Sequence, residues 1–208
     1  MEQKLIVDRK ESSLKTVTFN DIGVYASFSL GNNSKLNKSY ARKTCSLKNC
    51  KYLERELRIM LRFHTNPFIV HAANHNIHFE TNAQGVMCHI YMEYATLGNL
   101  KKLISAAGGA LPEVSVKLAA RMILQGLKAL HSEGYVHCDL KPSNVLVFPS
   151  TTCGVPWELK LGGFGLSKEP SMNSRLYYPG TREYMPLEWT DPNRFVGNDA
   201  YVAQARDI

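Results

Sequence analysis

The pattern of apolar and polar positions divides the chain into a first part rich in strands and a second part rich in helices. Residues 18–30 are rich in β-formers and partly alternate, which is typical of strands around a turn. The polar run 31–34, Gly-Asn-Asn-Ser, predicts a further turn, and short strands are expected at 39–44 and 89–94. Apolar residues recur at helical spacing over 49–63, so we expect one buried helix face there.

The clearest helical pattern lies further along, at residues 112–133. A proline suits its first turn, apolar residues share one face, and Gly134 suits the C-terminal cap. A shorter helix is expected at 99–107, two short strands at 145–147 and 158–161, and loops rich in glycine and proline after them. The predicted fold class is therefore α+β, with a mostly β N-terminal part, a mainly helical second part and a site between them.

Composition excludes several classes of protein. With 44% hydrophobic and 21% charged residues, the 208-residue chain has the make-up of a globular domain rather than of a disordered or low-complexity protein. Its longest apolar runs are far shorter than the ~20 residues that span a bilayer. Its N-terminal residues also lack the apolar stretch of a signal peptide. We expect no membrane association and a location in the cytoplasm or the nucleus.

Neither the cysteines nor the charges favour a metal or nucleic-acid site. The five cysteines are odd in number and scattered without a C-x-x-C pair, so we expect reduced, structural thiols rather than zinc ligands. Residues 1–62 carry 13 Lys and Arg against 6 Asp and Glu, whereas residues 63–208 carry 12 of each sign. A basic segment is compatible with nucleic acid, an acidic partner or a solvated face. Few aromatic residues lie among these charges, so nucleic acid is not favoured.

The segment 137–144, His-Cys-Asp-Leu-Lys-Pro-Ser-Asn, carries the strongest chemical signal. It follows the long predicted helix and precedes a predicted strand, and it sets an acid, a cation and a carboxamide two and three residues apart. Such spacing in an extended loop lets the three side chains point at one reacting centre. Asp139 could deprotonate a hydroxyl, Lys141 could neutralise a phosphate, and Asn144 could hold a divalent cation through oxygen.

The same segment resembles the catalytic loop of eukaryotic protein kinases, H-R-D-x-K-x-x-N, and its Lys-Pro-Ser-Asn run is similar to the serine/threonine branch. Residues 90–94 (Ile-Tyr-Met-Glu-Tyr) and 180–185 (Gly-Thr-Arg-Glu-Tyr-Met) extend the resemblance to plant kinases of the mitogen-activated protein kinase kinase kinase-like group. The resemblance implies a bilobal, protein-kinase-like fold. It would comprise an N-terminal extension at 1–17, an N-lobe with hinge at 18–95, and an incomplete C-lobe at 96–208 that includes the activation segment.

The resemblance also implies an ATP site between the lobes. A Tyr-Ala-Arg-Lys run is similar to the kinase V-A-I-K strand, which makes Lys43 the candidate cation for the α- and β-phosphates. Glu56 is its candidate ion-pair partner. Met92 corresponds to the residue at the back of the adenine pocket, and Glu93 through Ala95 correspond to the hinge whose backbone binds adenine.

For phosphoryl transfer, the resemblance implies a catalytic base, a cation, a metal ligand and a substrate-contacting segment. Asp139 would be the base, Lys141 would support the transferred phosphoryl group, and Asn144 would hold Mg²⁺. Thr181 corresponds to the segment that contacts the protein substrate. Glu188 stands in Pro-Leu-Glu, where the A-P-E motif ends the activation segment.

Two departures from the kinase pattern affect the nucleotide and the metal. Where kinases have Asp-Phe-Gly, this chain has Gly163, Phe164 and Gly165, so the principal magnesium-holding carboxylate is missing. The phosphate-covering loop keeps one of its three glycines, Gly23, with an aspartate and an alanine at the other two positions. We expect the binding of ATP and of Mg²⁺ to be weak or lost.

Two further departures affect control and completeness. Cys138 replaces the H-R-D arginine, which in the family pairs with a phosphorylated activation loop, so we expect control by other means. Asp207, next to the last residue, matches the beginning of the long central helix of the kinase C-lobe. Kinase domains continue with several more helices, so an apolar face of the helix at 112–133 is expected to be uncovered.

Three interpretations of function follow. The preferred one is a serine/threonine kinase homologue with impaired catalysis, a pseudokinase-like signalling or binding protein that engages a partner kinase or a protein substrate; Gly163 motivates it. The first alternative is an active, atypical serine/threonine kinase with Asp139 as its base. The second is a non-functional truncated gene product, motivated by the expected absence of the later helices.

Overall fold

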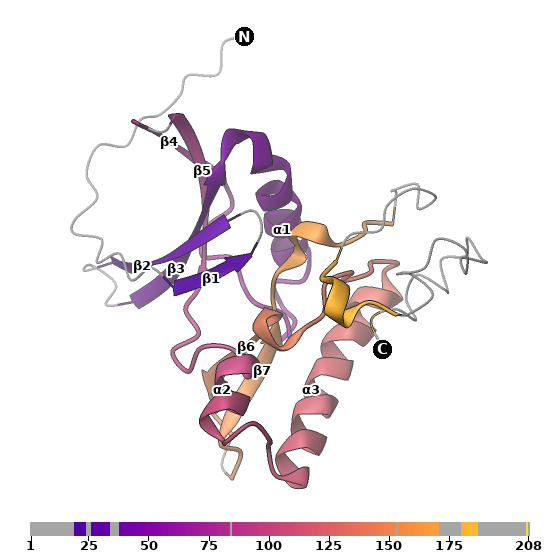
Figure 1. Cartoon of the computed structure of the whole chain (residues 1–208). Helices are drawn as coiled ribbons and strands as arrows, with labels where there is room; N and C mark the ends of the chain where they lie inside the picture. Colours follow the sequence, from indigo (N-terminus) through magenta and orange to yellow (C-terminus); the bar gives the residue numbers. More distant parts are fainter. Residues whose placement is uncertain are drawn as a thin grey trace.

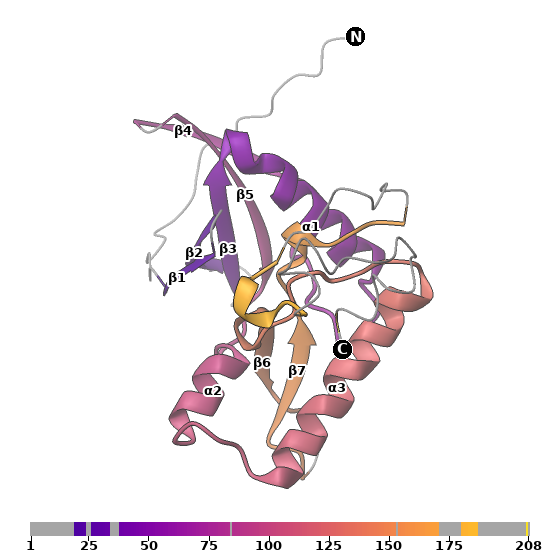
Figure 2. The same cartoon turned by 45° about the vertical axis from the view of Figure 1, so that its right-hand side comes forward.

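A computed structural model of the chain describes residues 19–23, 26–33, 38–83, 85–152, 154–170, 180–186 and 207. These residues form two lobes, one above the other in Figures 1 and 2. The upper lobe holds a five-stranded sheet with helix α1 (Cys50–Arg62) against it. The lower lobe holds helices α2 (Leu100–Ala106) and α3 (Glu113–Ser132) and a two-stranded sheet. The expected α+β, bilobal fold is confirmed, and the predicted extension at 1–17 lies outside the described residues.

The N-terminal sheet is antiparallel throughout and has the strand order β1-β2-β3-β5-β4. Its strands are β1 (Phe19–Gly23), β2 (Ala26–Asn33), β3 (Lys38–Ser46), β4 (His78–Asn82) and β5 (Gly85–Glu93). The turn predicted at 31–34 is wrong for residues 31–33, which continue β2 and pair with residues 38–40 of β3. The sequence analysis missed β4, because all five of its side chains are exposed and it shows no apolar alternation.

Helix α1 packs on the sheet through the face that the sequence predicts. Leu53, Leu57 and Met60 are buried, and each such side chain contributes ~1.5–3 kcal/mol when removed from water. The same face carries Glu56, whose carboxylate is also buried. Because a buried charge is costly without a partner, this position requires a cation on the sheet opposite.

Strands β6 (Val145–Pro149) and β7 (Trp157–Leu161) form the small antiparallel sheet of the lower lobe. The chain that leaves α1 joins the end of this sheet. The N–H of Leu161 donates to the carbonyl oxygen of Phe68 at 2.8 Å, and the N–H of Val70 donates to the carbonyl oxygen of Leu161 at 2.9 Å. The turn that follows β7 therefore lies at the junction of the two lobes, where Figure 2 shows it below α1.

Helix α3 runs along the lower lobe and agrees closely with the predicted span. It begins after Pro112 and ends before Gly134, whose φ of 78° is in the left-handed region that glycine tolerates. Its middle approaches β7 so closely that a β-carbon at Gly126 would lie 2.8 Å from Cδ1 of Leu161. Helix α3 and strand β7 are therefore closely packed, and the loop at 137–144 connects α3 to β6, the partner strand of β7.

The outer surface of α3 keeps several apolar side chains exposed. Val114, Val116 and Leu124 are exposed, but they are spread around the helix and do not form one apolar face. Within the described ranges, no helix is long and apolar enough to cross a membrane.

Candidate active site

The loop between α3 and β6 gathers the predicted catalytic residues around one carboxylate. Oδ1 of Asp139 accepts a hydrogen bond from Oγ1 of Thr181 at 2.6 Å, and Oδ2 accepts one from Nδ2 of Asn144 at 2.9 Å. Nζ of Lys141 lies 3.1 Å from Oδ2 of Asp139 and donates to Oγ1 of Thr181 at 2.6 Å. The structure thus brings together four residues that the sequence singled out, three from the loop at 137–144 and Thr181 from a second segment.

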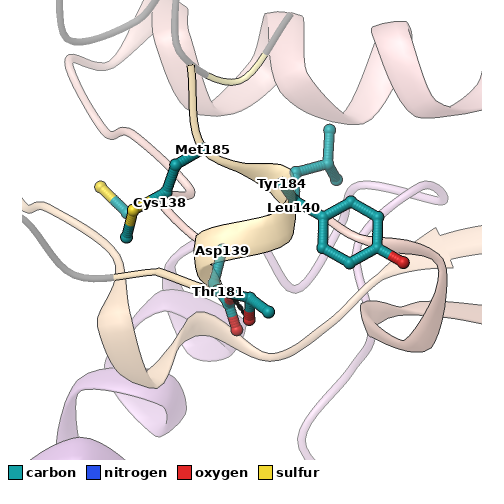
Figure 3. Close-up of a pocket in the computed structure, with 6 residues that line it drawn as sticks. All are labelled: Cys138, Asp139, Leu140, Thr181, Tyr184 and Met185. Carbon is teal, nitrogen blue, oxygen red and sulfur yellow. Dashed lines mark hydrogen bonds between the residues drawn. The ribbon is translucent and has the colours of Figure 1, made fainter. Parts of the chain in front are cut away.

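This arrangement holds a hydroxyl group between a carboxylate and an ammonium group. The Thr181 hydroxyl donates to Asp139 and accepts from Lys141, and both hydrogen bonds are charge-assisted. A carboxylate in this position can take up the proton of a hydroxyl group, and an adjacent cation can stabilise the resulting negative charge. Figure 3 shows Asp139 and Thr181 meeting in a small pocket, which is also lined by Cys138, Leu140, Tyr184 and Met185.

The carboxylate of Asp207 fixes the beginning of the loop at 137–144. Its Oδ2 accepts the N–H of His137 at 2.7 Å, and its Oδ1 accepts the N–H of Cys138 at 2.9 Å. Cys138 has a φ of 66°, in the left-handed region that residues other than glycine rarely adopt, and these bonds hold it there. The sequence analysis assigned Asp207 no such role, because 70 residues separate it from His137.

Lys43 and Glu56 form the ion pair that the sequence predicts. Nζ of Lys43, on β3, lies 2.6 Å from Oε2 of Glu56, on α1, and also 5.2 Å from the ring centroid of Phe28 on β2. The Glu56 side chain is 1% exposed and that of Lys43 is 14% exposed, so solvent screens the pair little. A cation is therefore held between the sheet and α1.

The predicted hinge begins at the last residue of β5, and the Glu93 carboxylate has a role that the sequence did not reveal. Met92 is buried and pairs with Ala41 of β3. The Glu93 carboxylate accepts two hydrogen bonds from Nζ of Lys160, at 2.9 and 2.8 Å, and one from the N–H of His71 at 2.7 Å. Glu93 thereby ties the hinge to β7 of the lower lobe. The sequence analysis considered only the backbone of Glu93.

Beyond Glu93 the hinge turns sharply, and the phosphate-covering loop is described only in part. The carbonyl oxygen of Ala95 accepts the N–H of Gly98 at 2.9 Å. Gly23 ends β1 and pairs with Ala26, but the two residues between them lie outside the described ranges. Glu188 lies outside them as well.

In the turn after β7, Gly163 stands at the position of the kinase aspartate, and the side-chain amide of Asn144 lies next to it. Gly163 has φ 78° and ψ 39°, Phe164 is fully buried, and Gly165 packs against α1. A β-carbon on Gly163 would lie 2.6 Å from both Cγ and Oδ1 of Asn144. The Asn144 side chain, whose Nδ2 also donates to the carbonyl oxygen of Asp139 at 2.7 Å, therefore occupies the space that a side chain at position 163 would need.

The expectation of free, structural cysteines holds for the residues that can be placed. Cys45, Cys50, Cys88 and Cys138 are free and buried, whereas Cys153 lies outside the described ranges. Burial is the main cause that raises the pKa of the Cys45 thiol to about 11 and that of the Cys50 thiol to about 12. Thiols with such pKa values stay protonated at neutral pH and are poor nucleophiles.

Comparisons with known proteins identify the class to which this fold and site belong. Residues 22–204 match the family described as "Protein kinase domain", so the chain belongs to the protein kinase family. Within its serine/threonine branch, the chain resembles mitogen-activated protein kinase kinase kinases of plants. It is 33% identical over 167 residues to mitogen-activated protein kinase kinase kinase 17 of Arabidopsis thaliana, covering 79% of this chain and 41% of that protein.

Two other relatives from Arabidopsis thaliana show similar coverage. The chain is 31% identical over 157 residues to mitogen-activated protein kinase kinase kinase 18, covering 73% of this chain and 44% of that protein. It is 35% identical over 154 residues to mitogen-activated protein kinase kinase 7, covering 73% of this chain and 45% of that protein. The matches thus span less than half the length of each of these relatives.

The family uses ATP and Mg²⁺, but the residues present do not fit the usual magnesium site. Magnesium prefers near-octahedral coordination by carboxylate, phosphate and water oxygens. Position 163 offers no ligand, which leaves the neutral side chain of Asn144 as the predicted ligand, and the nearby Asp139 carboxylate already contacts Thr181, Lys141 and Asn144. In the part of the chain that the structure describes, no group of three or more His, Cys, Asp and Glu side chains could hold a metal ion.

Proposed function

We propose that this chain is a serine/threonine kinase homologue that binds a nucleotide weakly and engages a protein partner, with little or no phosphoryl transfer. The observation that carries the proposal is the turn at Gly163, where the Asn144 side chain fills the space in place of a metal-binding carboxylate. Charge stabilisation directed at a transition state commonly contributes ~100–1,000-fold to a rate. Its loss at this position therefore favours binding over catalysis.

The remaining site supports retention of nucleotide binding. The Lys43–Glu56 pair is intact, and Glu93 anchors the hinge to the lower lobe. Lys43 supplies a positive charge that a triphosphate can use without a metal ion. The partner of such a protein would be another kinase or a kinase substrate, in keeping with the family.

A second candidate function is that of an active, atypical serine/threonine kinase. The 2.6 Å bond from Thr181 to Asp139 favours it, because the carboxylate is already placed to accept a hydroxyl proton. Lys141 completes the same arrangement. The two candidates differ in whether Asp139 determines a rate.

Nucleotide titration with and without Mg²⁺, together with a phosphoryl-transfer assay, tests the proposal. We expect a fluorescent ATP analogue to bind with similar affinity in both conditions, and Lys43→Met to weaken it at least ~10-fold, about 1.4 kcal/mol. Lys117→Met is the matched control, since Lys117 is exposed on α3. Wild type and Asp139→Asn should transfer phosphate at the same background rate.

Two results would contradict this function. Mg²⁺-dependent transfer that Asp139→Asn abolishes would establish the active kinase instead. A protein that neither shifts its melting temperature with ATP nor binds a partner kinase would refute nucleotide binding and partner binding together.

A further inference from the structure

Three arginines of α1 face acidic residues of the lower lobe. Arg55, Arg58 and Arg62 stand at intervals of three and four residues, so they share one side of the helix. Arg55 and Arg58 contact Glu169, and Arg62 contacts Glu133. Part of the positive charge concentrated in residues 1–62 is thus neutralised within the chain.

Glu169 is the less exposed of the two carboxylates and contacts two of the arginines. Its Oε1 accepts from Nε of Arg58 at 3.3 Å, and its Oε2 accepts from Nη2 of Arg58 at 2.8 Å, which is the two-point geometry of a strong guanidinium–carboxylate pair. Nε of Arg55 lies 3.9 Å from the same Oε2. The Glu169 side chain is 17% exposed and that of Arg55 is 12% exposed, whereas that of Arg58 is 57% exposed, so solvent and salt reach the contact only from the Arg58 side.

The same arginines lie next to the residue that holds Lys43. Arg55 precedes Glu56 in the helix, and its Nη1 donates to the carbonyl oxygen of Gly165 at 3.0 Å. A β-carbon on Gly165 would lie 3.7 Å from Oε2 of Glu56. The segment from Gly165 to Glu169 therefore contacts α1 at the helical turn that carries Glu56.

We propose that Glu169 is a positioning residue: through Arg58 and Arg55 it holds α1 where Glu56 reaches Lys43, with no modification of the chain required. Helix α1 packs against the sheet of the upper lobe on one side and is held by Glu169 of the lower lobe on another. This inference deepens the proposed function, because Lys43 is its nucleotide-binding cation, but the placement of α1 can be measured without any nucleotide.

The Arg62–Glu133 pair provides a matched control. It also joins α1 to the lower lobe through a guanidinium and a carboxylate, with Nε of Arg62 2.6 Å from Oε2 of Glu133. Its side chains are 61% and 36% exposed, and it involves only the last residue of α1. Such exposed pairs contribute little to stability, and this one is remote from Glu56.

The test compares Glu169→Gln with Glu133→Gln by acylation of Lys43 and by amide hydrogen exchange of residues 50–62. Loss of the Glu169 carboxylate should increase the population of a conformation in which α1 has moved away from the sheet. We therefore expect the labelling rate of Lys43 to rise about fivefold or more and amide exchange across α1 to become faster. Glu133→Gln should leave both readouts at the wild-type level. Arg58→Gln, which alters an exposed side chain, should reproduce Glu169→Gln even if the latter folds poorly.

Equal labelling and exchange in Glu169→Gln, Arg58→Gln and Glu133→Gln would overturn the proposal. A lower melting temperature of Glu169→Gln with unchanged Lys43 labelling would also overturn it, since that result describes a merely structural contact. Failure of wild type to bind nucleotide would refute the proposed function and leave these readouts unaffected.

Discussion

Nζ of Lys43 lies 2.6 Å from Oε2 of Glu56, so a strand and a helix of the upper lobe are joined by one largely buried pair of charges. The pair is the part of the candidate site in which sequence and structure agree most directly. It also has a defined environment, since Phe28 covers the ammonium group from β2. Several consequences of the site can be tested from this starting point.

Replacing Glu56 with glutamine should destabilise the protein by about 1–3 kcal/mol, because Lys43 would keep its charge and lose the opposite one in a buried setting. Chemical unfolding monitored by fluorescence measures this change. Glu113→Gln is the control, because its partner Lys117 is exposed and the pair lies within α3. Equal effects of the two substitutions would show that burial does not strengthen the Lys43 pair.

Gly163→Asp should make nucleotide affinity sensitive to Mg²⁺ while lowering stability by about 1–2 kcal/mol. Aspartate tolerates the left-handed backbone at this position better than most residues. Its β-carbon must nevertheless displace the Asn144 side chain, which would give up bonds to Asp139. Nucleotide titrations at several Mg²⁺ concentrations provide the measurement.

Gly163→Asn separates shape from charge in that experiment. It should displace Asn144 and destabilise the fold to a similar extent, with no gain in sensitivity to Mg²⁺. If the Asp and Asn variants respond to Mg²⁺ in the same way, the missing carboxylate is not what limits metal binding.

Gly126→Ala should lower the free energy of unfolding by about 1–3 kcal/mol, the usual result of overpacking a tight contact. The added methyl group would meet Cδ1 of Leu161 at 2.8 Å and the carbonyl oxygen of Phe68 at 3.0 Å. Gln125→Ala, at the neighbouring exposed position, should be neutral or slightly stabilising because alanine favours helix. If Gly126→Ala leaves the free energy of unfolding unchanged, α3 and β7 can move apart without loss of stability.

Stability should fall as the pH rises from about 9 toward 11, because burial raises the pKa of Cys45 to about 11 from its ordinary value of 9.0. The folded protein holds these thiol protons more tightly than the unfolded chain, so the contribution is complete below pH 9 and is lost through this window. Cys50 and Cys88 act in the same direction. Urea unfolding across the window, compared with a variant that has alanine at all three positions, isolates the thiols from lysine and tyrosine. An identical pH slope in both proteins would be the contrary result.

The sequence predicts the parts of this molecule that depend on local pattern. Helices α1 and α3 carry long apolar stripes, so the sequence alone predicts them. The segment 137–144 has its candidate catalytic residues within one loop, so it too can be identified without a structure. Strand β4 exposes every side chain and gives no such pattern. The register of β2 was obscured by turn-forming residues that nevertheless pair within the sheet.

Contacts between distant segments could not be predicted from the same patterns. Arg58 and Glu169 are 111 residues apart, and an exposed helix charge looks the same whether or not it has a partner. The crowding of Asn144 against Gly163 depends on the path of two separate turns. The bond from Lys160 to Glu93 likewise depends on how the lobes meet. Each of these follows from tertiary packing rather than from local propensity.

The hydrogen bonds that Asp207 accepts also set an order of events during synthesis. Asp207 lies 70 residues after His137 and 69 residues after Cys138. The N–H groups of His137 and Cys138 therefore cannot form these hydrogen bonds until Asp207 has left the ribosome. Closing so long a loop is slow, whereas all five strands of the N-terminal sheet lie within residues 19–93 and leave the ribosome long before Asp207. The N-terminal lobe can therefore form well before the loop at 137–144 reaches its final shape, and a nascent chain passes through a stage in which it has Lys43 in place without an ordered Asp139.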